Sequence, residues 1–156
     1  MLRNSLIGIG AGCFLLVGCL TLSGCGDGLT RVPITGLLTV QGQPLAGASV
    51  QFFPTGSTQG LGAIGTSGPD GKFTVISSRD NDAGVPAGKY TVRVSLMMDG
   101  KGNILPPEAL QADYPDAQEA VPAPYSTSSS NLEITIPEQG GEVKIDLPVK
   151  LKGKKK

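Results

Sequence analysis

From residue 30 to the C-terminus, apolar side chains recur at every second position rather than at every third or fourth. The clearest example is residues 90–97, where the apolar positions are Tyr90, Val92, Val94 and Leu96. Because successive side chains of a strand point to opposite faces, this pattern predicts strands with one buried and one exposed face. Such strands are typical of antiparallel sheets whose outer face meets water. We therefore expect an all-β domain.

Six further runs have a similar character, and Gly-rich or Pro-rich turn signals separate them. The runs are 32–40, 48–53, 63–66, 73–75, 132–136 and 143–149. Gly68-Pro69-Asp70-Gly71 is a strong turn signal, since Asp caps its own backbone and Gly tolerates positive φ. A second turn at Gln139-Gly140-Gly141 is expected to close the last hairpin. Seven short strands without crossover helices predict a seven-stranded antiparallel β-sandwich.

The stretch 99–131 departs from this pattern. It contains five prolines and is longer than an ordinary connection between strands. Residues Pro107–Gln111 could form one helical turn, with Pro at its first position. Ser126–Ser130 is a run of small residues without the Gly-x-Ser-x-Gly turn of serine hydrolases. A loop of this length is either functional or loosely ordered.

The N-terminus has the features of an export signal. Arg3 precedes an apolar run over residues 6–22, which is shorter than the roughly 20 residues that a spanning helix requires. The run ends in Leu22, Ser23, Gly24 and Cys25, a quartet that resembles the lipobox of bacterial lipoproteins. The resemblance implies that the Cys25 thiol accepts diacylglycerol and that cleavage occurs just before it. More than one acyl chain would make the anchor stable.

Two alternatives to this assignment remain. Leu16-Val17-Gly18-Cys19 fits a looser version of the motif, but the apolar run continues after Cys19, whereas Gly26-Asp27-Gly28 follows Cys25. An uncleaved membrane helix would also leave the rest of the chain outside, because Arg3 lies on the short side. Either way, the sequence predicts the cell envelope, on the non-cytoplasmic side of a membrane. In some Gram-negative bacteria, an Asp directly after the lipidated Cys resembles an inner-membrane retention signal. The residue after Cys25 is Gly26 instead, which favours the outer membrane.

These observations divide the chain into four parts. Residues 1–24 are the signal peptide, 25–31 the lipid anchor and tether, 32–150 the sandwich with its long loop 99–131, and 151–156 a basic tail. At 156 residues the chain has room for one ordinary domain. We expect a monomer.

Four segments of the mature chain carry motifs of Gly, Pro or apolar residues, namely Gly36–Pro54, Asp70–Phe73, Val85–Val92 and Val121–Tyr125. Laid end to end, these segments resemble the carboxypeptidase regulatory-like, or transthyretin-like, domains of small bacterial lipoproteins. The resemblance covers about Thr35 to Leu147. It implies a Greek-key sandwich of the transthyretin type. Such motifs are folding signals and mark a module rather than a reaction, since a fold does not by itself give a function.

Composition argues against several classes of function. The chain has no His, which removes the commonest general base and metal ligand, and the histidines on which transthyretin-like hydrolases depend are missing. All three Cys lie within the first 25 residues, so the rest of the chain can form neither a disulfide nor a Cys-based zinc site. A formal net charge of zero does not favour nucleic acid as a partner. We predict no enzyme and no cofactor.

Some polar residues could bind a ligand. Asp80-Asn81-Asp82, or Asp113 with Asp116, could be fragments of a calcium site, although Asp and Asn more often cap tight turns. Five lysines between residues 150 and 156 could meet anionic headgroups or could form a solvated tail. Arg93, Gln51 and Glu133 could line a binding surface or simply face water.

The leading hypothesis is thus a non-catalytic, lipid-anchored envelope module with a structural or protein-interaction role. Its expected partners are the membrane, through the N-terminal lipid, and another envelope protein or a glycan. The alternative is a glycan- or calcium-binding lipoprotein that uses loop 99–131.

Overall fold

The computed structural model describes residues 27–79, 82–110 and 112–153, and these residues contain strands and no helix. A helical membrane span is accordingly absent from the described part of the chain. The strands are β1 (Ile34–Val40), β2 (Gln43–Pro44), β3 (Ser49–Thr55), β4 (Ala63–Thr66), β5 (Lys72–Thr74), β6 (Ile76–Ser77), β7 (Gly88–Ser95), β8 (Met97–Met98), β9 (Gln118–Glu119), β10 (Leu132–Ile136) and β11 (Gly141–Leu147). Each of the seven predicted runs overlaps a strand, so the all-β prediction is confirmed.

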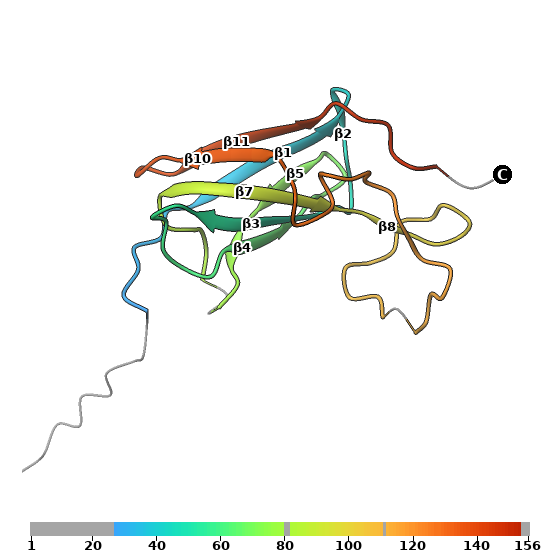
Figure 1. Ribbon diagram of the computed structural model, residues 1–156, viewed down its shortest axis with the longest axis horizontal. Helices are drawn as coiled ribbons and strands as arrows, with labels where there is room; N and C mark the ends of the chain where they lie inside the picture. Colours follow the sequence, from blue (N-terminus) through green and yellow to red (C-terminus); the bar gives the residue numbers. More distant parts are fainter. Residues whose placement is uncertain (1–26, 80–81, 111, 154–156) are drawn as a thin grey trace, which may run out of the picture.

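The strands form two principal sheets in a sandwich-like arrangement (Figure 1). One sheet has the order β11-β1-β2, with β5 also paired to β1, and the other has the order β10-β7-β3-β4-β6. The small pair β8-β9 stands apart from both. The short strands β2, β6, β8 and β9 were not expected, because two residues are too few to show an alternating pattern.

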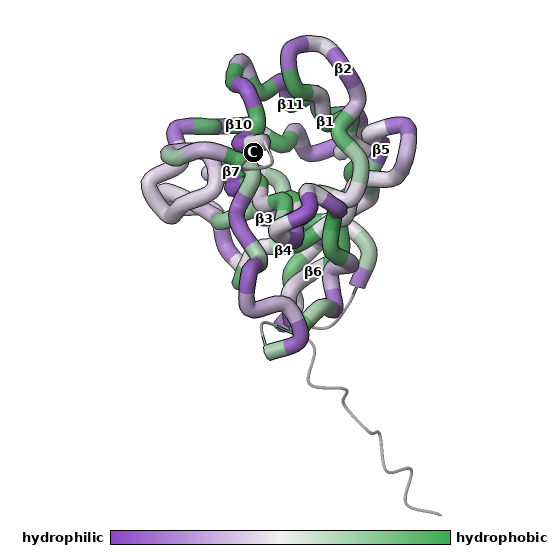
Figure 2. Tube along the Cα trace, turned by 90° about the vertical axis from the view of Figure 1, so that its right-hand side faces the viewer, coloured by the Kyte–Doolittle hydropathy of each residue, from purple (hydrophilic) through white to green (hydrophobic). Residues whose placement is uncertain are grey.

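Both sheets contribute to one hydrophobic core. Tyr90, Val92 and Val94 of β7 are at most 1% exposed, and they alternate with half-buried residues on the outer face. The Phe52 ring lies 6.2 Å from that of Phe73 in the opposite sheet and 6.1 Å from that of Tyr90. In Figure 2 the strands carry the most hydrophobic segments, whereas the outer turns are largely hydrophilic.

The Tyr90 hydroxyl gives the core one fixed polar contact at its border. It donates a hydrogen bond to the Pro86 carbonyl oxygen over 2.7 Å. Burial of the phenol raises the pKa of Tyr90, so the hydroxyl keeps its proton and remains a donor. The aromatic residue that follows the Ala87-Gly88-Lys89 turn therefore joins that turn to the core.

The expectation of a wholly antiparallel sandwich closed by a last hairpin is wrong. β10 pairs antiparallel with β7, whereas β11 pairs in parallel with β1 along seven residues, from Ile34 opposite Gly141 to Val40 opposite Leu147. Gly140 and Gly141 have φ of 70° and 132°, and the Gly141 amide donates to the Pro33 carbonyl. A Cβ on Gly140 would lie 2.5 Å from that carbonyl oxygen. The two glycines thus let the chain cross between the sheets, and each strand buries its apolar side in the shared core.

The long loop 99–131 has two parts. The first part is residues 97–119, which we call the loop lobe. It begins with β8, which follows β7 in the chain, and ends with β9, which pairs with β8. Residues 107–110 do not form the expected helical turn: the Ala109 amide bonds the Pro106 carbonyl, which closes a single tight turn. Residues 124–130 then run beside β7, where the Tyr125 carbonyl accepts from the Val94 amide.

Candidate binding site

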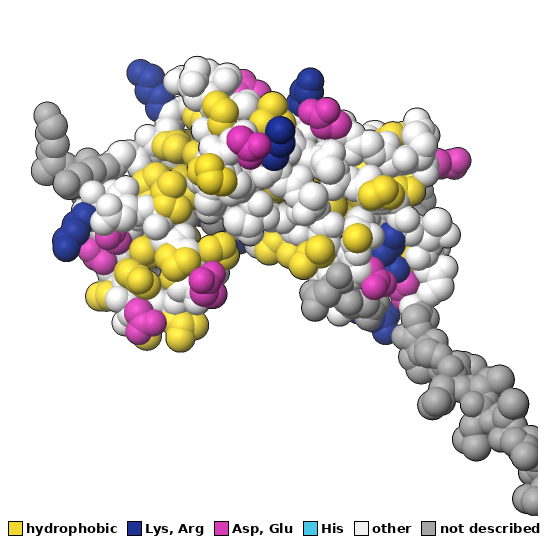
Figure 3. Space-filling model, turned by 180° about the vertical axis from the view of Figure 1, so that it is seen from behind, with side chains coloured by type: hydrophobic (Ala, Val, Ile, Leu, Met, Phe, Trp, Pro, Cys, Tyr) yellow, Lys and Arg dark blue, Asp and Glu magenta, His cyan; other side chains and the backbone are white. Residues whose placement is uncertain are grey.

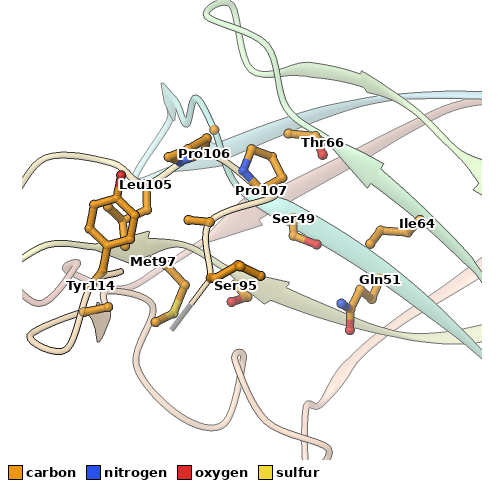
Figure 4. Close-up of a pocket in the computed structure, with 14 residues that line it drawn as sticks. Ser49, Gln51, Ile64, Thr66, Ser95, Met97, Leu105, Pro106, Pro107 and Tyr114 are labelled. Atoms are coloured by element: carbon orange, nitrogen blue, oxygen red, sulfur yellow. The ribbon is translucent and has the colours of Figure 1, made fainter. Parts of the chain in front are cut away.

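A slot lies between the loop lobe and the outer face of the five-stranded sheet. Its volume is about 290 Å³, near the lower end of the range for small-molecule sites. Strands β3, β4 and β7 provide its floor, and residues 105–117 of the loop lobe provide most of its wall (Figure 4). Part of the loop that the sequence singled out therefore forms one side of a cavity.

The floor of the slot is polar because it is the water-facing side of three alternating strands. Register places Ser49 of β3 between Thr66 of β4 and Ser95 of β7. One step along the same face, Gln51 lies opposite Ile64. The neighbours Val50 and Phe52 point into the core, so the alternation that builds the core also builds this floor.

The wall of the slot is apolar. Leu105, Pro106, Pro107, Leu110 and Tyr114 line it from the loop lobe. Leu105 is buried, whereas Leu110 is 67% exposed at the rim. Figure 3 shows hydrophobic side chains gathered on the lobe, at the lower left, and on the body next to it. A ligand in the slot would therefore meet hydrogen-bonding groups on one side and hydrocarbon on the other.

Three side chains of the floor have unused hydrogen-bonding capacity. Within the described part of the chain, Ser49, Gln51 and Thr66 make no side-chain hydrogen bond. The amide of Gln51 can donate and accept, and so can each hydroxyl. These groups are available to a ligand without breaking any contact within the protein.

The slot has no formal charge. None of the described residues that line it is Asp, Glu, Lys or Arg. Burying an ion without a partner is costly, so the lining favours an uncharged ligand. Chemistry that requires a charged acid or base is not supplied by these side chains.

Glu119 of β9 joins the loop lobe to the sheet beside the slot. Its carboxylate accepts hydrogen bonds from the Ser95 hydroxyl at 2.6 Å and from the Leu96 and Val121 amides at 2.9 Å each. Ser95 is a residue of the floor, so the same carboxylate also orients one floor hydroxyl. Hydrogen bonds to an ionised acceptor are stronger than neutral ones, which makes Glu119 a strong fastening point.

Gly47 allows the loop lobe to approach the sheet closely. Its φ is 73°, and a Cβ there would lie 2.8 Å from the Cγ2 atom of Ile104. The Pro44-Leu45-Ala46-Gly47 turn, which the sequence marked only as a folding signal, thus borders the slot.

The residues that the sequence proposed for ligand binding do not form one site. Gln51 lies in the slot, but Arg93 and Glu133 do not line it. Ser130 donates to the Val92 carbonyl, and Asp116 accepts from the Gly100 amide at 2.9 Å. Asp80 and Asn81 lie outside the described residues, while Asp82 lies 3.8 Å from Arg31. Among the described residues, no three His, Cys, Asp or Glu side chains are grouped so as to hold a metal ion.

The lipobox residues Leu22, Ser23, Gly24 and Cys25 lie outside the described residues. Of the predicted tether, residues 27–31 are described and contact the domain. Arg31 forms an ion pair with Asp27 at 2.5 Å, and this hydrogen bond, followed by one from the Leu29 amide, lowers the pKa of Asp27. The basic tail is described as far as Gly153, and the Lys152 amide donates to the Ala120 carbonyl.

The sequence marks loop 99–131 by its length and prolines but does not mark the sheet face that the loop covers. The wall residues Pro106, Pro107 and Tyr114 carry no signal beyond being apolar within a long loop. Ser49, Thr66 and Ser95 read as ordinary exposed positions, because nothing in a strand pattern shows what will cover its outer face.

Comparison with protein-family models, with curated proteins and with solved structures yields no match to this chain.

Proposed function

We propose that this protein is a non-catalytic, lipid-anchored module of the cell envelope that presents its loop lobe to a partner. The observation that carries the proposal is that the N-terminal start of the described chain and the loop lobe lie at opposite ends of the domain. The described chain begins at Asp27 at one end of the long axis, and the loop lobe lies at the other end (Figure 1). A lipid on Cys25, two residues before Asp27, would hold the first end at the membrane and leave the loop lobe at the far end of the domain.

The first residues after the proposed anchor support a short connection to the domain. Besides the Asp27–Arg31 ion pair, Val32 exchanges backbone hydrogen bonds with Val85 at 2.8 and 3.1 Å. The folded domain therefore begins close to Cys25, which limits how far the lipid can be from the sheets. We infer that the domain acts as a monomer close to the bilayer, on the non-cytoplasmic side and preferably at the outer membrane.

We further propose a transthyretin-like Greek-key topology for the seven longer strands. The neighbours β10-β7-β3-β4 in one sheet and β11-β1-β5 in the other support it. The parallel β1–β11 pair separates this chain from a purely antiparallel sandwich.

The anchor is tested by labelling cells that express the full chain with an alkyne-tagged fatty acid. We expect label on the wild-type protein and on Cys19→Ser, and none on Cys25→Ser. Both substitutions exchange one thiol for a hydroxyl within the same 25 residues, so Cys19→Ser is the matched control. Label that persists in Cys25→Ser but is lost in Cys19→Ser would place the lipid on Cys19 instead. An unlabelled wild-type protein would refute the lipid anchor.

The partner is tested by cross-linking in intact cells followed by mass spectrometry. An envelope protein enriched with the wild type but not with Cys25→Ser would support a protein-interaction role. The second candidate function is glycan binding by the same lobe, and the unused hydrogen-bonding groups of the slot favour it. Calcium gains no such support from the described residues.

A further inference from the structure

We infer that the slot between the loop lobe and the sheet binds an uncharged carbohydrate unit, with Ser49, Gln51 and Thr66 as its hydrogen-bonding residues and Pro107 and Tyr114 as its apolar wall. This inference deepens the proposed function. It rests on the proposed function only for its location, because the lipid anchor would place the slot on the non-cytoplasmic side of the membrane. It applies to a free sugar and to a sugar unit within a cell-wall polymer.

The two-sided lining selects this class of ligand. A sugar ring carries hydroxyls around its edge and C–H groups on its faces, so it can use a polar floor and a hydrocarbon wall at once. Purely apolar ligands would cover the free groups of Ser49, Gln51 and Thr66 without forming hydrogen bonds to them, and burying an unpaired polar group is unfavourable. The floor therefore disfavours a lipid chain.

The absence of charge narrows the class further. No described residue of the lining is ionised, so a phosphorylated or acidic sugar would enter without a counter-charge. The nearest arginine on this sheet face, Arg93 beside Gln51 in register, does not line the slot. A neutral sugar meets no such penalty.

An extended peptide fits the slot less well. Peptides that add to a sheet use a free strand edge for their main-chain hydrogen bonds. Here β3 runs along the floor between β4 and β7 and is paired on both sides at Ser49 and Gln51. The ligand must therefore be recognised by side chains, which suits a molecule with its own hydroxyls.

The size of the slot matches a small ligand. Its volume of about 290 Å³ lies at the lower end of the range for small-molecule sites. Leu110 at the rim is 67% exposed, so the wall is open at that edge. A single sugar unit at the end of a longer chain could enter there.

Calorimetric titration of the full-length protein in lipid nanodiscs tests the inference. The probes are glucose, N-acetylglucosamine and their β-1,4-linked disaccharides, with glucuronic acid, glucose 6-phosphate and hexanol as comparisons. We expect at least one neutral sugar to bind and its charged counterpart to bind at least tenfold more weakly. Tighter binding of the disaccharide would indicate a polymer, and equal binding a free sugar.

Two variants assign the binding to the slot. We expect Gln51→Leu to weaken binding five- to tenfold, because it removes one hydrogen-bonding side chain at nearly constant volume. Gln43→Leu, at an exposed position of β2, makes the same change elsewhere and should leave binding unchanged. Tyr114→Ala should weaken binding, and Tyr114→Phe should restore most of it, since the ring is the contact.

Several results would overturn the inference. These are no heat with any neutral sugar, equal or tighter binding of the charged probes, binding of hexanol alone, or equal affinity for Gln51→Leu and the wild type. Thermal unfolding of each variant shows whether it is folded. Should the anchor proposal fail, the protein is recovered from the soluble fraction, and the same titration then tests the slot separately.

Discussion

The sandwich body and the loop lobe are held together by different forces. Among the described residues of the body, nineteen buried side chains form one hydrophobic cluster that both sheets share. In the described part of the lobe, Leu105 is the one hydrophobic residue that is buried, while Ile104 and Leu110 are 45% and 67% exposed. In the lobe, backbone amides instead donate hydrogen bonds to the carboxylates of Glu119, Asp116 and Asp99, which hold its turns in place.

This difference explains why the slot is found at the border between the two. Packed side chains leave few voids larger than a water molecule, so the body has little room for a ligand. A lobe held by a few polar contacts can stand over the sheet without filling the space beneath it. It can also open locally at a lower free energy than the body.

The largest effect is expected from a cavity in the body. Phe52→Ala removes a ring that is 1% exposed and contacts both Phe73 and Tyr90. We expect it to lower the free energy of unfolding by about 3–5 kcal/mol in a urea titration. Phe53→Ala is the matched control, because Phe53 is adjacent in β3 but 44% exposed on the opposite face. Equal losses for the two variants would show that the core is not where the structure places it.

Loss of the Glu119 carboxylate should release the lobe and leave the body folded. We expect Glu119→Ala to lower the free energy of local opening by about 2 kcal/mol, since three hydrogen bonds to one ionised group are removed. Trypsin cleavage after Lys101, in the lobe, should become faster, while the urea midpoint of the sheets changes little. Glu108→Ala is the control, because Glu108 is an exposed glutamate of the same lobe, whereas Glu119 is half-buried. Unchanged cleavage would mean that other contacts hold the lobe.

Removal of a single polar contact from the body should matter less. Tyr90→Phe deletes the bond to the Pro86 carbonyl but keeps the buried ring. We expect a loss of about 1 kcal/mol in the free energy of unfolding, measured in urea. A loss as large as that of Phe52→Ala would contradict the view that packing dominates in the body.

The smallest effect should appear as a dependence on pH confined to the lobe. Hydrogen bonds from the Asn103 side chain and amide hold the pKa of Asp99 below its ordinary value of 3.8. The ionised form therefore favours the folded turn above that value, and this contribution is lost as the pH falls through the lowered pKa. The protection factors of the Lys101 and Asn103 amides, which are exchange rates corrected for the intrinsic pH dependence, should fall at low pH in the wild type and depend less on pH in Asp99→Asn.

Asp146→Asn provides the control for that experiment. The Asp146 pKa is also lowered, first by the Thr39 hydroxyl and then by the Gly42 amide, but this group lies at the end of β11. Its replacement should change acid sensitivity at the β1–β2 turn and leave lobe exchange unaltered. Lobe exchange that follows Asp146 rather than Asp99 would refute the separation of the two regions.

Local features of the chain were sufficient to predict the seven longer strands and their faces. Alternation along 90–97 identified β7 and its buried side, and the Asp70-Gly71 turn was confirmed with Gly71 at φ 76°. These predictions succeed because side-chain direction in a strand and positive φ at a glycine are properties of neighbouring residues. The export and lipidation signal of residues 1–25 is likewise a local pattern, and it remains a prediction from sequence alone.

Only the tertiary structure decided which strands pair and what covers each face. The turn before Gly141 looked like a hairpin, yet β11 pairs with β1, more than a hundred residues away in the chain. Likewise Gln51 became part of a slot because a distant proline-containing lobe stands over it. Both outcomes depend on which apolar surfaces are buried together, and that balance is set by contacts between segments far apart in the sequence.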